Sequence, residues 1–204
     1  MTRRSTADVV EVLDEGTLAF SIESRIIREL GERLVKQPEV ALVELIKNSY
    51  DADAAHCDVL YEPSSQIRVS DDGHGMTLDT FKTSWMRIGT SGKEADRLSQ
   101  RYHRRITGEK GIGRFAVRVL GRALKLETVA HDVKRGFLTL LTAQFDWHTF
   151  DRNQDLGGVT VPYRLVRLEG ERAEGTSLTI TELREAASSI KLESVRTASI
   201  SVVT

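Results

Sequence analysis

The order of two kinds of periodic segment constrains the fold of this chain most strongly. Apolar residues recur at helical spacing in residues 24–37 and again in residues 38–54. After Gly121 the chain is rich in β-branched residues, in four segments bounded by glycine-containing turns: residues 123–130, 136–145, 157–166 and 175–183. Helices followed by strands, with little βαβ alternation, predict an α+β fold. We expect a two-layer α/β sandwich with a mixed, mostly antiparallel sheet and its helices on one face.

Shorter segments complete this outline. They are a strand at 17–24, a pair of strands at 57–62 and 65–71, a short helix at 114–121 and another short helix near Glu182. Residues 1–16 lack periodicity and predict a flexible N-terminal arm. The polar, Arg-rich residues 76–107 predict either a functional lid or disorder, because long loops in compact domains are usually one or the other.

Composition places the chain among cytoplasmic proteins. Apolar residues make up 40% of its 204 residues, enough for the core of one domain. The single cysteine, Cys57, excludes an internal disulfide and favours a reducing compartment. The first residues turn acidic before an apolar run forms, which excludes a signal peptide, and no apolar segment has the length of a membrane span. We therefore expect a cytoplasmic protein with no membrane partner.

The charge of the chain is unevenly distributed. Its net charge is only −1, yet nine Lys and Arg residues stand against three acidic residues between Ser84 and Arg118. This segment therefore carries a charge of +6 and the remainder −7. A positive segment in an otherwise acidic protein indicates a nearby anion, although simple solvation explains it equally well.

Three polar residues interrupt the second predicted helix. Glu44, Asn48 and Asp51 follow one another at spacings of four and three, which places them in one stripe along the helix. Apolar and aromatic residues occupy the opposite half: Leu42, Leu45, Ile46 and Tyr50. Such a stripe is typical of a solvent-facing helix surface, and by itself it does not indicate a binding site.

Two glycine-rich turns follow downstream. Asp71, Gly73 and Gly75 come at alternate positions after a strand, where a backbone without side chains lets a flat ligand approach closely. Residues 107–113 carry Gly108, Gly111 and Gly113 before a helix, whose unpaired N–H groups would bind phosphate. The spacing differs from that of a P-loop, and the first turn alone is also compatible with an Asx turn.

With these motifs in this order, the chain resembles the GHKL ATPase superfamily, which includes gyrase B subunits, heat-shock chaperones, histidine kinases and MutL. The resemblance spans residues 20–185. ELIKNSYDADA resembles the Asn box, DDGHG the first glycine box, GEKGIGRF the second, RIGTSGK the opening of the lid and GTSLTITEL the late Gly-Thr strand. The DADA ending is closer to the chaperone, MutL and microrchidia branches than to histidine kinases.

The resemblance implies a domain organisation. Residues 17–190 would form the ATP-binding domain, with its helices enclosing the ATP site and a lid over about 76–113. Residues 191–204 would be a tail that leads to a further C-terminal domain.

The resemblance also implies roles for individual residues. Glu44 would be the general base for the attacking water, and the Asn48 amide oxygen would bind Mg²⁺. Asp71 would accept a hydrogen bond from the adenine amino group. The other residues expected around ATP are Asp51, Ala52, Gly73, Gly75, Met76 and Thr176 on the adenine and ribose side, and Thr90, Ser91, Lys93, Gly108, Lys110, Gly111, Ile112, Gly113 and Arg114 on the triphosphate side.

The implied function is Mg²⁺-dependent binding and hydrolysis of ATP, which drives a lid or dimer switch in a larger protein. The expected cofactors are ATP and Mg²⁺, and the expected partners are a second copy of the chain and a C-terminal domain or partner protein. Nucleic acid binding by the Arg-rich segment is a further alternative. Two other functions stay open: a nucleotide sensor without hydrolysis, and a histidine-kinase-like phosphotransfer domain.

Overall fold

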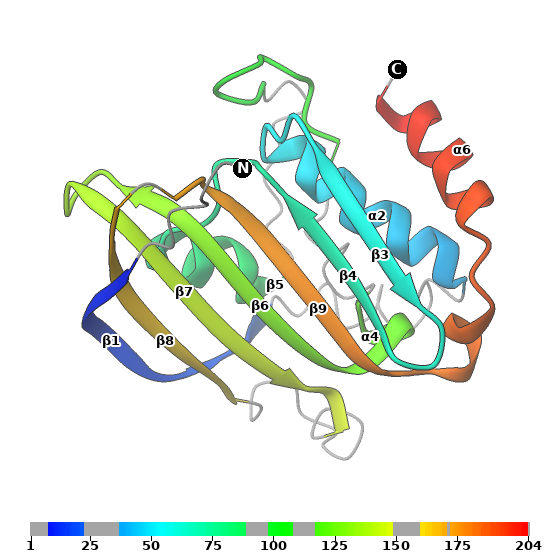
Figure 1. Ribbon diagram of the computed structural model, residues 1–204, viewed down its shortest axis with the longest axis horizontal. Coiled ribbons are helices and arrows are strands. Elements are labelled where there is room, and N and C mark those ends of the chain that lie inside the picture. Colours follow the sequence, from blue (N-terminus) through cyan, green and yellow to red (C-terminus); the bar gives the residue numbers. More distant parts are fainter. Residues whose placement is uncertain are drawn as a thin grey trace, which may run out of the picture.

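The computed structural model describes residues 8–22, 37–88, 98–107, 117–148, 160–170 and 172–203. Its main element is a seven-stranded sheet with the order β1-β8-β7-β6-β9-β4-β3, in which every neighbouring pair is antiparallel (Figure 1). The strands are β1 (Asp8–Ala19), β3 (Cys57–Glu62), β4 (Gln66–Asp71), β6 (Gly121–Asp132), β7 (Phe137–Asp146), β8 (Thr160–Glu169) and β9 (Gly175–Leu183). A separate parallel pair joins β2 (Ser21–Ile22) to β5 (Arg87–Ile88).

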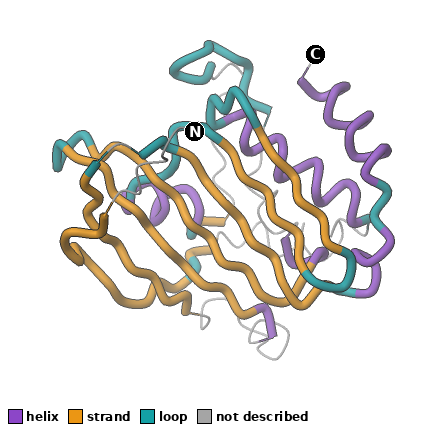
Figure 2. Tube along the Cα trace, in the orientation of Figure 1, coloured by secondary structure: helices purple, strands orange, loops and turns teal. Residues whose placement is uncertain are grey.

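Helices pack on this sheet (Figure 2). They are α2 (Pro38–Asp51), α3 (Leu78–Thr80), the π-helix η1 (Phe81–Trp85), α4 (Val117–Leu120), the 3₁₀-helix η4 (Glu185–Ser189) and α6 (Leu192–Val203). The expected α+β sandwich is therefore confirmed. Parallel pairing is confined, among the described residues, to the small β2–β5 pair. No helix in the described part of the chain is long and apolar enough to cross a membrane.

The core lies between the sheet and α2. Side chains at alternate positions of the central strands are buried on the helix-facing side, among them Leu126, Leu141 and Ile180. Helix α2 buries Leu42 and Leu45 against them. Pro38 lies in the first turn of α2, where its missing N–H costs no hydrogen bond, as the sequence predicts. The helix ends at Asp51, three residues before the predicted end at Ala54.

The prediction of a flexible arm over residues 1–16 is wrong for residues 8–16. These residues lie in β1, which pairs with β8 from Asp8 opposite Glu169 to Ala19 opposite Thr160. The register shifts twice within this ladder, once after Val9 and once after Val12. Each shift breaks the strict alternation of side chains that identifies a strand in a sequence. Acidic residues along the strand, which are common at sheet edges, further concealed the pattern.

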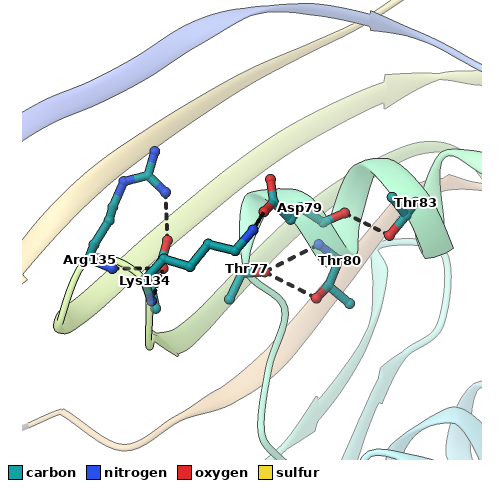
Figure 3. Close-up of polar contacts among 7 residues, drawn as sticks. Thr77, Asp79, Thr80, Thr83, Lys134 and Arg135 are labelled. Carbon is teal, nitrogen blue, oxygen red and sulfur yellow. Dashed lines mark hydrogen bonds and ion pairs between the residues drawn. The ribbon is translucent and has the colours of Figure 1, made fainter.

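The first part of the predicted lid packs on the core. Leu78, Phe81 and Met86 are buried, and Phe81 is fully so at 0% exposure. The Thr77 hydroxyl oxygen caps α3 by accepting the Thr80 N–H at 3.2 Å. The turn between β6 and β7 reaches this helix, where Lys134 Nζ pairs with Asp79 Oδ2 at 2.5 Å (Figure 3). Residues 76–88 are therefore not a free loop, and residues 89–97 and 108–113 of the predicted lid lie outside the described residues.

The chain after residue 190 also packs against the domain. Helix α6 contacts α2, and Val195 is buried with 3% exposure. The backbone N–H of Lys191 donates to Glu39 Oε1 in the first turn of α2 at 3.3 Å. The residues predicted to form a tail thus cover one side of the helix that carries the Asn box.

We predict that Phe81→Ala lowers the free energy of unfolding by about 3–5 kcal/mol, because it removes a fully buried ring and leaves a cavity. Ser84→Ala, at an exposed position in the same π-helix, should change it by less than about 0.5 kcal/mol. Urea denaturation of both variants measures the difference. Equal midpoints would show that Phe81 does not belong to the core.

Candidate functional site

The polar stripe of α2 is present, and its three side chains have different surroundings. Glu44 Oε1 accepts a hydrogen bond from Lys47 Nζ at 2.9 Å, and the Glu44 side chain is 30% exposed. Asn48 is half-buried and makes no side-chain hydrogen bond with the residues that the structure describes. Asp51 Oδ1 accepts hydrogen bonds from the backbone N–H of Thr107 at 2.8 Å and from its hydroxyl at 3.1 Å. Among the described residues, an amide without a side-chain hydrogen bond therefore lies between two carboxylates that each have one.

Asp71 lies at the end of β4, directly opposite Thr176 of β9. Its Oδ1 accepts the backbone N–H groups of Gly73 at 3.0 Å and Thr176 at 3.2 Å. Its Oδ2 accepts the Ser49 hydroxyl at 2.9 Å, which joins the strand to α2. Burial raises the pKa of the Asp71 carboxyl above its usual value, and these three hydrogen bonds oppose that effect only in part.

The first glycine box forms a tight turn after β4, and this turn packs against the end of α2 and against β6. Gly75 has a φ of +62°, and a Cβ at this position would lie 2.0 Å from the backbone oxygen of Val129. A side chain at Gly73 would lie 2.6 Å from the backbone oxygen of Ala52, at the end of α2. Both glycines are therefore required by close backbone contact. The turn continues to Met76, whose N–H donates to the Thr128 hydroxyl at 2.8 Å.

The structure thus brings together the described residues that the sequence predicts around adenine: Asp51, Ala52, Asp71, Gly73, Gly75, Met76 and Thr176. Glu44 and Asn48 lie along the same helix towards its N-terminus. The other predicted residues lie outside the described part of the chain: Thr90, Ser91, Lys93, Gly108, Lys110, Gly111, Ile112, Gly113 and Arg114.

Two residues of this site were missed by the sequence reasoning. Ser49 is 3% exposed and Thr128 is fully buried, and each hydroxyl holds another part of the site. Thr128 Oγ1 also lies 3.0 Å from Thr176 Oγ1 and so connects the glycine box to β9. A hydroxyl next to Asn48 on the buried side of an apolar helix was a signal for Ser49. Thr128 had no such signal, because threonine is common in strands.

Asp72, the second acidic residue of the glycine box, holds the loop that follows α2 through hydrogen bonds. Asp72 accepts the backbone N–H groups of Ala55 at 2.7 Å and His56 at 2.8 Å, and its other oxygen lies 2.9 Å from His56 Nδ1. The hydrogen bond from the His56 backbone, supported by the other two, lowers the pKa of Asp72 to about 2. The same side-chain hydrogen bond to Asp72 raises the pKa of His56 above its usual value.

We predict a bell-shaped pH dependence for the stabilising effect of this pair. The Asp72 contribution is fully present above pH ~4 and is lost as the pH falls towards about 2. The His56 contribution is fully present below pH ~6.5 and is lost as the pH rises through the raised pKa of the imidazole. Urea denaturation should therefore show that Asp72→Asn lowers the free energy of unfolding most between pH ~4 and ~6.5. If Asp72→Asn lowered the free energy of unfolding by the same amount at every pH, the Asp72–His56 pairing would be contradicted.

Comparison with known proteins agrees with this arrangement. The family model described as "Histidine kinase-, DNA gyrase B-, and HSP90-like ATPase" matches residues 36–176. The "DNA mismatch repair protein MutL" of Beijerinckia indica is 30% identical over 148 residues, which are 69% of this chain and 23% of that protein. The MutL of Halobacterium salinarum is 32% identical over 119 residues, 57% of this chain and 15% of that protein.

A third relative is named as a restriction enzyme. The protein named "Putative type II restriction enzyme HgiDII" from Herpetosiphon aurantiacus is 27% identical over 175 residues, 85% of this chain and 26% of that protein. The chain therefore spans only about a quarter, or less, of the length of these relatives. The match to the family model covers well over half of the chain, and it includes α2 and the opposed residues Asp71 and Thr176 at one end of the β4–β9 pair. The chain belongs to the GHKL family of histidine kinase-, gyrase B- and HSP90-like ATPases.

Proposed function

We propose that this chain binds Mg-ATP between α2 and the first glycine box and hydrolyses it to ADP and phosphate. The observation that carries the proposal is the half-buried Asp71 carboxylate, held by three donors from α2, the glycine box and β9. A hydrogen-bond acceptor fixed in this way at the start of a glycine-rich turn is suited to bind the amino group of adenine. Thr176 supports it from the neighbouring strand.

The proposed phosphate end lies further along α2. The Asn48 amide oxygen is free among the described residues and suits a hard cation such as Mg²⁺, which takes oxygen ligands. When bound, Mg²⁺ supplies neutralisation of phosphate charge. Glu44, one turn before Asn48, orients the attacking water and takes up its proton, and its contact with Lys47 holds this carboxylate in one orientation. Lys93 and the glycines at 108, 111 and 113 remain predictions for the triphosphate.

We further propose that ATP binding drives a switch within a longer protein, and that it involves a second copy of the chain or a C-terminal domain. The support is the small share of the relatives that the chain spans. Relatives named for DNA mismatch repair and restriction favour an action on DNA and a cytoplasmic location. A lid over the site is retained as a proposal, without the segment from 76 to 88, which packs on the core.

We predict that Glu44→Gln reduces phosphate release at least 100-fold while it changes the Kd for Mg-ATP by less than about threefold, because a general base acts on water and not on nucleotide affinity. Glu39→Gln, which neutralises a carboxylate in the first turn of the same helix, is the control and should retain activity. Isothermal titration and a phosphate-release assay measure the two effects. Binding without hydrolysis in the unaltered full-length protein would favour the sensor function instead, and labelled phosphate on protein would favour phosphotransfer.

We predict that Ser49→Ala weakens Mg-ATP binding by about tenfold, because it removes a donor that orients Asp71 in a buried setting. Ser70→Ala is a matched control, since this hydroxyl lies next to Asp71 in sequence but bonds to Ser177. Isothermal titration with a non-hydrolysable ATP analogue measures both. Equal affinities for the two variants would show that Ser49 does not support the adenine acceptor.

A further inference from the structure

A buried carboxylate at the end of α2 holds a distant segment of the chain. Asp53 is fully buried at 0% exposure and has a φ of +59°, a conformation that aspartate tolerates better than most residues. Its carboxylate accepts the Ser99 hydroxyl at 2.5 Å and the backbone N–H groups of Arg101 at 2.7 Å and Tyr102 at 3.2 Å. Burial disfavours the charged form, but these hydrogen bonds and the charge of Arg104 bring the pKa of Asp53 below its usual value.

Arg104 makes a second attachment at the same end of the helix. Its guanidinium group lies 4.8 Å from the centre of the Tyr50 ring and 4.5 Å from that of the Tyr102 ring. It also donates to the backbone oxygens of Ala54 at 2.7 Å and Tyr50 at 3.4 Å. One cation therefore satisfies carbonyl groups at the end of α2 and stacks on one ring from each segment.

Ser99 links the two attachments into one unit. Its hydroxyl donates to Asp53 and accepts the Arg104 N–H at 2.8 Å, and its own N–H donates to the Arg104 backbone oxygen at 2.8 Å. Residues 98–105 thus form a closed turn that also contains the bridge between Leu98 and Arg105. In Figure 1 this turn is the green loop above the end of α2. We use the name Asp53–Arg104 clasp for the contacts of Asp53 with this turn together with the contacts of Arg104 with the end of α2.

Thr107 lies three residues after Arg104, and both its backbone N–H and its hydroxyl donate to Asp51. It also directly precedes the sequence Gly-Glu-Lys-Gly-Ile-Gly. We propose that the Asp53–Arg104 clasp is a positioning device, which sets Asp51 and the chain entering the glycine-rich sequence in place before nucleotide arrives. This inference rests on the proposed function, because it assigns the clasp a role in nucleotide affinity. Asp53 and Arg104 do not themselves contact the nucleotide in this proposal.

A preformed clasp makes a distinct prediction for kinetics. If the clasp orders the turn before nucleotide arrives, it strengthens binding, because nucleotide does not then have to offset the conformational entropy lost when the turn is ordered. Loosening it should raise Kd and KM and leave kcat at saturating ATP nearly unchanged. A clasp that serves only the stability of the fold would lower the unfolding midpoint without a change in Kd.

The test compares Asp53→Asn and Arg104→Met with Arg105→Gln in the full-length protein. Arg105 is exposed and lies in the same turn, so its variant controls for lost positive charge. In the absence of nucleotide, the Arg101 and Tyr102 amides should exchange hydrogen at least tenfold faster in the first two variants. Both variants should also bind a non-hydrolysable Mg-ATP analogue about tenfold more weakly, the change expected from losing one charge-assisted hydrogen bond, with kcat within about twofold of the unaltered protein.

Each other result has a definite meaning. Unchanged Kd and KM in Asp53→Asn and Arg104→Met, or a loss confined to kcat, would overturn the inference. If these variants do not fold, Tyr102→Leu removes only a half-exposed ring from the clasp, and an unchanged Kd in that variant would overturn it equally. Failure of the unaltered protein to bind the analogue would instead overturn the proposed function on which the inference rests.

Discussion

The arrangement of the site depends on the hydrogen bonds that converge on Asp71. This carboxylate is half-buried, so each donor around it offsets part of the cost of removing a charge from water. The donors come from α2, from the glycine box and from β9, which lies more than a hundred residues further along the chain. One side chain therefore ties the helix to the sheet at the place where the proposed nucleotide would bind.

The end of α2 collects further carboxylates, and each one holds a different segment. Asp51 accepts hydrogen bonds from Thr107, and Asp53 accepts them from the turn at 98–105. Asp72, in the glycine box, accepts hydrogen bonds from residues 55 and 56. Each of these three carboxylates accepts at least one backbone N–H group. Such bonds fix the path of the chain independently of the side chains in the segment that is held.

Membership of the GHKL family accounts for the motifs, and the site shows why the first glycine box needs its glycines. This turn approaches both the end of α2 and β6 so closely that a side chain at Gly73 or Gly75 would collide with backbone there. The Arg-rich segment contributes Arg104 to a structural contact, so not every positive charge in it serves a phosphate. Solvation alone therefore does not explain all of the positive charge between Ser84 and Arg118, because Arg104 has a structural contact.

Local pattern in the sequence determined the helix that begins at Pro38, the paired strands β3 and β4, the four later strands and the motifs of the family, because each depends on neighbours in the chain. Tertiary structure decided the rest. Strand β1 became visible only through its partner β8, since its register shifts conceal the alternation. Phe81 belongs to the core, and Ser49, Thr128 and Asp53 have structural partners, only because distant segments meet there. The free energy of these contacts comes from burial and from donors far along the chain, which no local pattern encodes.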